Sequence, residues 1–168
     1  MVIAVSFTVS FFSQRKILVH CAALADVDAC EGHQDLAQKT NVNGTRHLVE
    51  ALEGREAKLV YISTDLVYEG KKESYREDDK VSPVNFYGQT KIQGEQEARK
   101  KKGTLIVRTN FFGWSISGKR SLGEFFYNNL KAQNSINGFV DVMFCPLYVS
   151  ILTDLILNMV EKQLSGLY

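Results

Sequence analysis

The sequence contains few of the residues that define disulfide-rich or metal-binding proteins. It has three cysteines, two prolines and three histidines in 168 residues. Cys21, Cys30 and Cys145 form no CxxC pair, and no His/Cys spacing matches a metal site. A disulfide framework and a zinc centre are therefore not expected. An odd number of unpatterned cysteines is typical of a reduced, cytoplasmic compartment.

Long hydrophobic runs and an excess of one charge are also missing. The apolar stretch at residues 1–12 is shorter than the roughly 20 residues that span a bilayer. It has neither a preceding basic region nor a clear cleavage site, so we do not expect a signal peptide. Its β-branched and aromatic residues favour a strand or a hydrophobic arm. The net charge of +1 gives no reason to expect nucleic acid or membrane as a partner.

No glycine-rich dinucleotide motif is present. A G-x-x-G-x-x-G run, which binds a pyrophosphate at a helix N-terminus, occurs nowhere in the chain. Residues 1–15 are not a substitute, because they contain neither glycine nor an acidic residue. We treat residues 1–15 as an atypical apolar N-terminal segment.

Predicted strands alternate with predicted helices along the rest of the chain. Short apolar runs predict buried strands, and apolar residues at helical spacing predict helices. The alternation predicts an α/β fold, a Rossmann-like doubly wound parallel sheet with right-handed crossovers. We predict strands at residues 16–23, 58–63 and 104–108, helices at 34–53, 85–102, 122–132 and 150–163, a polar connection at 26–31 and a polar loop at 69–82.

Three segments are expected at the chemically important edge of this sheet. In open α/β sheets, ligands bind beyond the carboxyl ends of the strands. The residues that follow the three predicted strands are 21–23, 63–65 and 109–111. We therefore expect these segments to converge on one crevice.

The clearest chemical signal is Tyr87 followed four residues later by Lys91 on a predicted helix. Residues at i and i+4 share one face, and a nearby ammonium favours the phenolate form of a tyrosine. Such a phenol works as an acid or base closer to neutral pH. A hydroxyl such as that of Thr64 at a strand end can bind a substrate carbonyl. Alternatively, Thr64 or Asp65 caps the turn, and the Tyr/Lys spacing also occurs by chance.

These residues lie within motifs that resemble the dTDP-4-dehydrorhamnose reductase family, in the extended short-chain dehydrogenase/reductase superfamily. The resemblance covers residues 16–113 and continues more weakly to residue 168. The matching motifs occupy residues 20–23, 27–31, 41–45, 63–70, 75–79, 83–91, 94–95 and 108–113.

The resemblance implies reduction of a 4-keto-6-deoxy nucleotide sugar with NADPH or NADH. Tyr87 would donate a proton to the keto oxygen, which Thr64 would orient. Lys91 would hold the nicotinamide ribose and lower the pKa of Tyr87. Asp65 and Phe111 would lie near the sugar. The further residues implied at the cofactor are Ala22, Ala23, Ser63, Thr109 and Asn110.

The missing glycine-rich unit predicts an incomplete NAD(P)-binding domain over residues 16–168, with the start of a substrate-binding region at about 111–150. It also predicts weak or no cofactor binding by this chain alone, which is expected to be a fragment, a truncated product or a degenerate homologue. Residues 164–168 resemble the approach to a further strand.

Two other functions stay open. A related reductase-like protein is the regulatory subunit of methionine adenosyltransferase, so a non-catalytic subunit is the first. A nucleotide-sugar epimerase or dehydratase is the second, although Leu66 stands where dehydratases carry glutamate. The sequence leaves both a homodimer and a partner subunit open.

Overall fold

The computed structural model describes residues 6–12, 15–115, 121–138, 140 and 145–168. The chain divides into two compact units, Met1–Arg108 with Leu164–Tyr168 and Thr109–Gln163. Parts of the predicted N-terminal segment and of the predicted 111–150 region lie outside the described residues.

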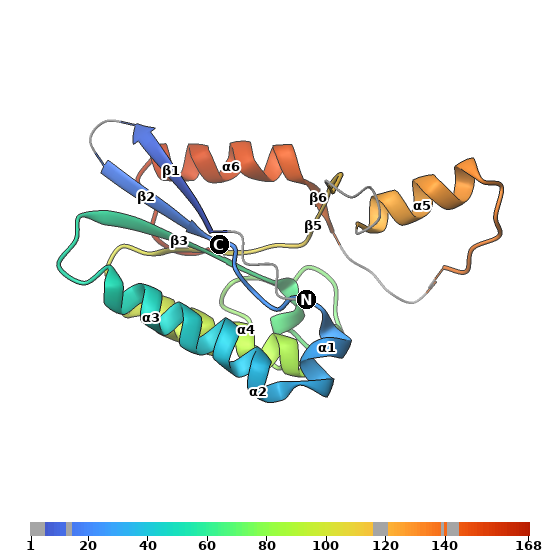
Figure 1. The fold of residues 1–168 in the computed structure, drawn as a ribbon, viewed down its shortest axis with the longest axis horizontal. Coiled ribbons are helices and arrows are strands. Elements are labelled where there is room, and N and C mark those ends of the chain that lie inside the picture. Colours follow the sequence, from blue (N-terminus) through green and yellow to red (C-terminus); the bar gives the residue numbers. More distant parts are fainter. Residues whose placement is uncertain (1–5, 13–14, 116–120, 139, 141–144) are drawn as a thin grey trace. The chain divides into compact units, whose positions relative to one another are not determined.

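The first unit is built on a five-stranded sheet with the order β1-β2-β3-β4-β7 (Figure 1). Strands β2, β3, β4 and β7 pair in parallel, which confirms the predicted parallel sheet. Strand β1 is antiparallel to β2, a direction that the apolar pattern did not indicate. The strands are β1 (Ser6–Phe12), β2 (Arg15–His20), β3 (Ala57–Ser63), β4 (Leu105–Arg108) and β7 (Gly166–Leu167).

The core of this unit lies where β3 and β4 pack against helix α4 (Phe86–Arg99). Leu59, Tyr61, Ala98 and Ile106 form one buried cluster. A central parallel strand is covered on both faces, so its sequence is a nearly continuous apolar run rather than an alternating one. This explains why residues 58–63 were recognisable as a buried strand.

The connection after β2 differs from the sequence-based expectation. Residues 26–31 were predicted as a polar connection, and helix α1 (Val27–Gly32) occupies most of this range. The Asp26 carboxylate accepts a hydrogen bond from the Ala29 amide and caps the helix N-terminus. Only Cys30 of this helix is buried, so the sequence carries no apolar periodicity there.

The predicted helix at 34–53 is present but is not uniform. It consists of α2 (Gln34–Ala37), a π-helical turn η1 (Gln38–Asn43) and α3 (Gly44–Ala51). In Figure 1, α3 and α4 lie side by side on one face of the sheet. The π-turn matters for the site, because π-helical turns are frequent at functional positions.

The second unit contains two short strands and two helices. Strand β5 (Phe111–Phe112) pairs in parallel with β6 (Leu147–Tyr148). Helix α5 (Leu122–Lys131) begins with a capping box between Ser121 and Glu124, and α6 (Val149–Glu161) follows β6. The helices predicted at 122–132 and 150–163 are confirmed to within one or two residues.

Among the described residues, no helix is both long and apolar enough to cross a membrane. Within the same residues, no three His, Cys, Asp or Glu side chains gather as a metal site. All three cysteines are free thiols.

Candidate functional site

The carboxyl ends of β2, β3 and β4 lie at one edge of the sheet. His20 pairs with Tyr61, and Ser63 pairs with Arg108, so the strands end almost in line. Ala22 and Ala23 follow β2 at this edge, and Thr64 follows β3. The predicted convergence of the first two segments is therefore confirmed within the first unit.

A close approach between α4 and the turn after β3 brings Tyr87 to Thr64. Thr64 begins a 3-10 turn, η2 (Asp65–Val67), and its hydroxyl accepts from the Leu66 amide. Asn85 caps α4 by accepting from the Gly88 amide. A Cβ at Gly88 would lie 2.3 Å from the Leu66 carbonyl oxygen, so only glycine permits this contact. The first turn of α4 is thereby held against the turn that starts with Thr64.

The Tyr87 phenol lies beside Thr64, and its environment keeps it protonated. Burial raises the pKa of Tyr87 to about 12, and electrostatic interactions with Cys30 and Asp65 act in the same direction. A hydrogen bond with the Thr64 side chain opposes this shift. The pKa of Tyr87 is therefore raised overall, and the lowering by Lys91 that the resemblance implies stays a prediction. The phenol is therefore in its protonated form at neutral pH.

Lys91 points to the sheet rather than to the phenol. Its ammonium donates a 2.6 Å hydrogen bond to the Ile62 carbonyl and lies 4.3 Å from the ring centroid of Tyr61. Burial lowers the pKa of Lys91 to about 8, and electrostatic interactions with Glu95 and Cys21 oppose this lowering. The i, i+4 spacing correctly placed both residues on one helix face. It did not fix the end of a long flexible side chain.

Asn41 is a site residue that sequence reasoning did not single out. From the π-turn, its side-chain oxygen accepts from the Leu24 amide at 2.7 Å. Its amide nitrogen donates to the Leu24 carbonyl and to the Thr90 hydroxyl. Thr90 in turn donates to the Tyr87 carbonyl. Asn41 therefore joins the segment after β2 to the helix turn that carries Tyr87 and Lys91.

A buried ionic network connects the ends of β3 and β4 to helix α4, next to Thr64. The Ser63 hydroxyl donates to the Glu95 carboxylate at 2.6 Å. Arg108 donates two bonds to the same carboxylate and a third to the Tyr68 hydroxyl. The Ser63 hydroxyl is thus directed toward Glu95, and the cofactor-binding role predicted for Ser63 stays a prediction. A buried glutamate was not expected, because charged residues on a helix usually face solvent.

Thr109, Asn110 and Phe111 belong to the second unit. Thr109 directly follows β4, and the Asn110 carbonyl accepts from the Leu147 amide. Phe111 begins β5 and is half exposed. The cofactor and substrate roles predicted for these three residues stay predictions.

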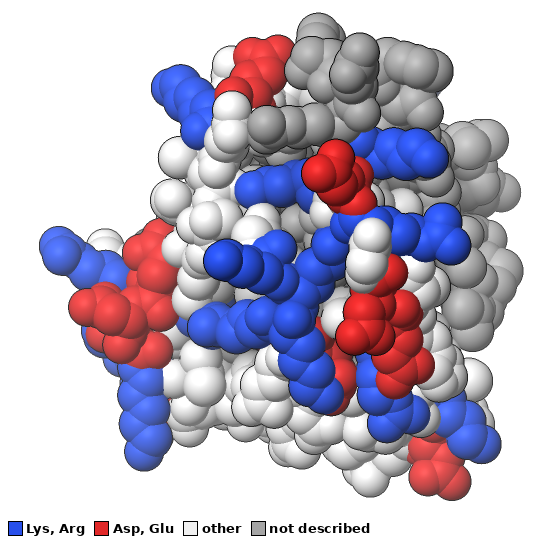
Figure 2. Space-filling view, turned by 90° about the vertical axis from the view of Figure 1, so that its left-hand side faces the viewer, with Lys and Arg blue, Asp and Glu red and all other residues white. Residues whose placement is uncertain are grey.

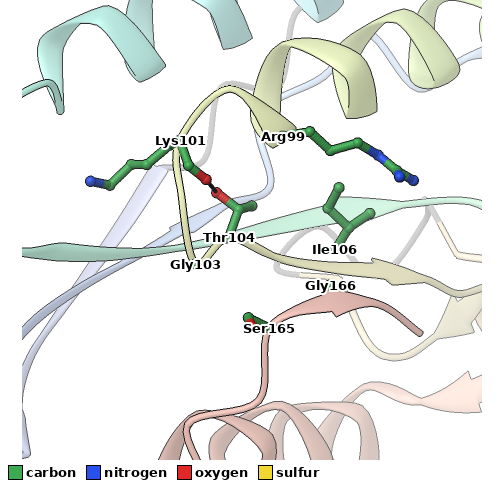
Figure 3. A pocket seen from close by; sticks show the side chains of 7 residues that line it. All are labelled: Arg99, Lys101, Gly103, Thr104, Ile106, Ser165 and Gly166. Carbon is green, nitrogen blue, oxygen red and sulfur yellow. Dashed lines mark hydrogen bonds between the residues drawn. The ribbon is translucent and has the colours of Figure 1, made fainter.

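A cavity of about 200 Å³ lies at the opposite edge of the sheet, at the amino ends of β4 and β7. Figure 3 shows Arg99 and Lys101 extending in opposite directions around it. The Thr104 hydroxyl is bound to the Lys101 carbonyl. In this view the two cations do not converge on a common point, so the cavity does not compete with the edge at Thr64 as a reaction site.

Charges of both signs are interleaved on the surface. Figure 2 shows lysine and arginine side chains gathered toward the middle of one face, with aspartate and glutamate side chains beside them. Ion pairs such as Lys100 with Glu97 neutralise part of the positive charge. Pairs of this exposed kind contribute little to stability.

The family model for the RmlD substrate binding domain matches residues 7–168. The chain belongs to the RmlD substrate binding domain family. A dTDP-4-dehydrorhamnose reductase of Mycolicibacterium smegmatis is 30% identical over 158 residues, covering 90% of this chain and 47% of that protein. The bovine methionine adenosyltransferase 2 subunit beta is 41% identical over 96 residues, covering 56% of this chain and 29% of that protein.

Solved structures of the RmlD family agree with the fold. The dTDP-4-dehydrorhamnose reductase of Bacillus anthracis in complex with NADP has a TM-score of 0.83 and 35% identity. The match covers 90% of this chain and 54% of that structure. The chain thus spans about half or less of the length of these relatives. The α/β fold with a parallel sheet is shown by this comparison.

Proposed function

We propose that this RmlD-family chain contributes the catalytic residues of an NAD(P)H-dependent reductase of a 4-keto-6-deoxy nucleotide sugar. The observation that carries the proposal is the contact between the Tyr87 phenol and the Thr64 side chain at the carboxyl edge of the sheet. Similarity to a dTDP-4-dehydrorhamnose reductase over 90% of the chain supports it.

The side chains at this edge divide the work of reducing a ketone. Tyr87, with a pKa raised to about 12 by burial, is protonated at neutral pH and can donate its proton to the developing alkoxide. The Thr64 hydroxyl orients the same oxygen. Lys91 uses one of its three protons on the Ile62 carbonyl, which leaves the others to bind ribose hydroxyls.

The chain fits the nicotinamide end of NADPH or NADH, which would supply the hydride. Ala22 and Ala23 are small residues that follow β2 at the sheet edge, and the proposal puts the nicotinamide beside them. The pyrophosphate lacks a glycine-rich motif to bind it in this sequence. We therefore expect weak dinucleotide binding by this chain alone, and micromolar affinity for NADPH in a calorimetric titration would overturn that expectation.

The test of the reductase proposal is Tyr87→Phe. NADPH oxidation with dTDP-4-dehydrorhamnose should fall by about 10²–10⁴-fold, the usual contribution of a general acid. Tyr75→Phe is the matched control, because the Tyr75 hydroxyl accepts from the backbone amides of Lys71 and Lys72 in an exposed loop. Equal rates for Tyr87→Phe and the wild type would exclude Tyr87 as the proton donor.

A second candidate is a non-catalytic subunit of another enzyme. The 41% identity to methionine adenosyltransferase 2 subunit beta over 96 residues favours it, together with the missing glycine-rich motif. Size-exclusion chromatography with a methionine adenosyltransferase catalytic subunit tests this function. A stable complex would support it, and separate elution at micromolar concentrations would count against it.

We also infer a reduced, cytoplasmic compartment, because Cys21, Cys30 and Cys145 are all free thiols.

A homodimer and a partner subunit are both compatible with the reductase proposal. Sedimentation of the purified chain distinguishes the monomer from the dimer.

A further inference from the structure

Side chains of helix α4 form hydrogen bonds with two consecutive residues at the end of β3. Lys91 donates to the Ile62 carbonyl, and one turn later Glu95 accepts from the Ser63 hydroxyl. Thr64, the residue proposed to orient the substrate oxygen, follows immediately. The position of Thr64 relative to α4 therefore depends on both contacts.

Glu95 also connects these contacts between α4 and β3 to strand β4. Its side chain is 2% exposed and accepts two bonds from Arg108, whose own side chain is 8% exposed. Arg99 approaches the same carboxylate from the surface at 3.4 Å. The carboxylate thus links the ends of two neighbouring strands to the helix between them in sequence.

We propose that Glu95 is a positioning residue, which holds Ser63 and Arg108 in place and supplies the counter-charge that keeps the buried Lys91 ammonium in the site. This inference deepens the proposed function, on which its catalytic meaning rests. Glu95 does not touch the reacting atoms and acts through Lys91 and the end of β3.

The charges around Lys91 show why a carboxylate is needed. His20, the last residue of β2, and Cys21, which follows it, both interact electrostatically with the Lys91 ammonium. The ammonium also lies over the ring of Tyr61 on β3. On α4 itself, Tyr87 lies one turn earlier, and its phenol is protonated. Glu95 is the buried carboxylate that favours the charged form of Lys91. Removing the Glu95 carboxylate would leave the buried cations of Lys91 and Arg108 without its negative charge.

The test compares Glu95→Gln with Glu97→Gln. Glu97 lies two residues further along the same helix, where it pairs with Lys100. The ammonium of Lys91 is titrated by NMR of the ¹⁵N-lysine-labelled protein. Glu95→Gln should lower the Lys91 midpoint by about one pH unit, a tenfold change in its proton affinity, whereas Glu97→Gln should match the wild type. Equal midpoints in all three proteins would overturn the proposal.

Two further variants guard against a failure to fold. Glu95→Asp keeps the charge and should bring the Lys91 midpoint back toward the wild-type value. Arg108→Gln removes the other charge of the buried pair but keeps the carboxylate, so it should not lower the midpoint. A midpoint that falls as far in Arg108→Gln as in Glu95→Gln contradicts the proposal, because disruption of the network and not the Glu95 charge would then explain both results. The titration needs neither substrate nor cofactor, so its result is independent of whether the chain reduces a nucleotide sugar.

Discussion

Gly94 lies so close to Tyr61 that a Cβ built on it would be 2.1 Å from the phenolic oxygen. Gly94 is on α4 between Lys91 and Glu95, and Tyr61 is fully buried on β3. The missing side chain therefore sets how closely the helix packs on the strand. The hydrogen bonds from α4 to Ile62 and Ser63 require this short distance between the helix and β3.

Gly94→Ala is expected to destabilise the first unit by about 1–3 kcal/mol, the usual cost of adding a group to a packed core. Urea unfolding measures the change. Gly32→Ala is the control, because no atom lies within 4 Å of the added Cβ at that helical position. If the two variants unfold at the same urea concentration, the contact with Tyr61 does not limit the packing.

Gly88→Ala should impair the site more than the fold. The added Cβ would meet the Leu66 carbonyl, a backbone atom that cannot rotate away, so the start of α4 must move from the turn after Thr64. A displacement of about 1 Å in a reacting group costs on the order of 10²-fold in rate. The measurement is NADPH oxidation under the conditions used for Tyr87→Phe, with Gly44→Ala as the helix control. Unaltered turnover would show that Tyr87 keeps its place without this contact.

His20 should make the protein less stable in mild acid. The Thr45 hydroxyl donates to the Asn41 carbonyl, so its oxygen accepts from Nε2 of a neutral His20. Burial, followed by the charge of Lys91, lowers the pKa of His20 to about 4 from 6.5. Between these two values the unfolded chain binds more protons than the folded one, and stability falls as the pH falls.

The contribution of His20 to this pH dependence is about 3 kcal/mol at most. Urea unfolding at several pH values from 4 to 7 measures it. His20→Gln should flatten the dependence, and His33→Gln, at an exposed position, should leave it as in the wild type. An equally steep loss of stability in His20→Gln would assign the effect to other groups.

Tyr68→Phe should loosen the loop at residues 69–82. The Tyr68 hydroxyl accepts from Arg108 and donates to the Arg76 carbonyl, so it ties the loop to the buried network. Losing a hydrogen bond to a charged group costs about 1.5–3 kcal/mol. Trypsin should cut the loop at Lys71 or Lys72 faster in this variant than in the wild type. Similar cutting rates would place the anchor of the loop elsewhere.

The strands could be predicted from short, nearly continuous apolar runs, and most helices from apolar residues at helical spacing. Residues 58–63 were predicted as a strand, and β3 begins one residue earlier. Helix α1 could not be predicted in this way, since it is short and buries a single residue. The antiparallel direction of β1 is also not encoded in its composition, because any apolar strand can pair in either direction.

At the site, the side chains of Thr64 and Tyr87 lie in contact, as the motifs suggested, whereas the spacing did not indicate that the Lys91 ammonium bonds to the Ile62 carbonyl. Backbone spacing determines which face of a helix a residue occupies, but a four-carbon side chain can end several ångströms away. Glu95 and Arg108, 13 residues apart, meet only when α4 packs on the sheet. A contact of this kind depends on tertiary structure, so local patterns do not reveal it.

Asn41 has a consequence for how the chain reaches its native state. Its side chain bonds to Leu24, 17 residues away, and to Thr90, 49 residues away. Forming these bonds requires closing two long loops, which local helix formation alone does not bring about. The edge that carries Thr64 and Tyr87 should therefore assemble late, together with the sheet. Amide protons near Asn41 should then exchange with solvent only when the whole first unit opens.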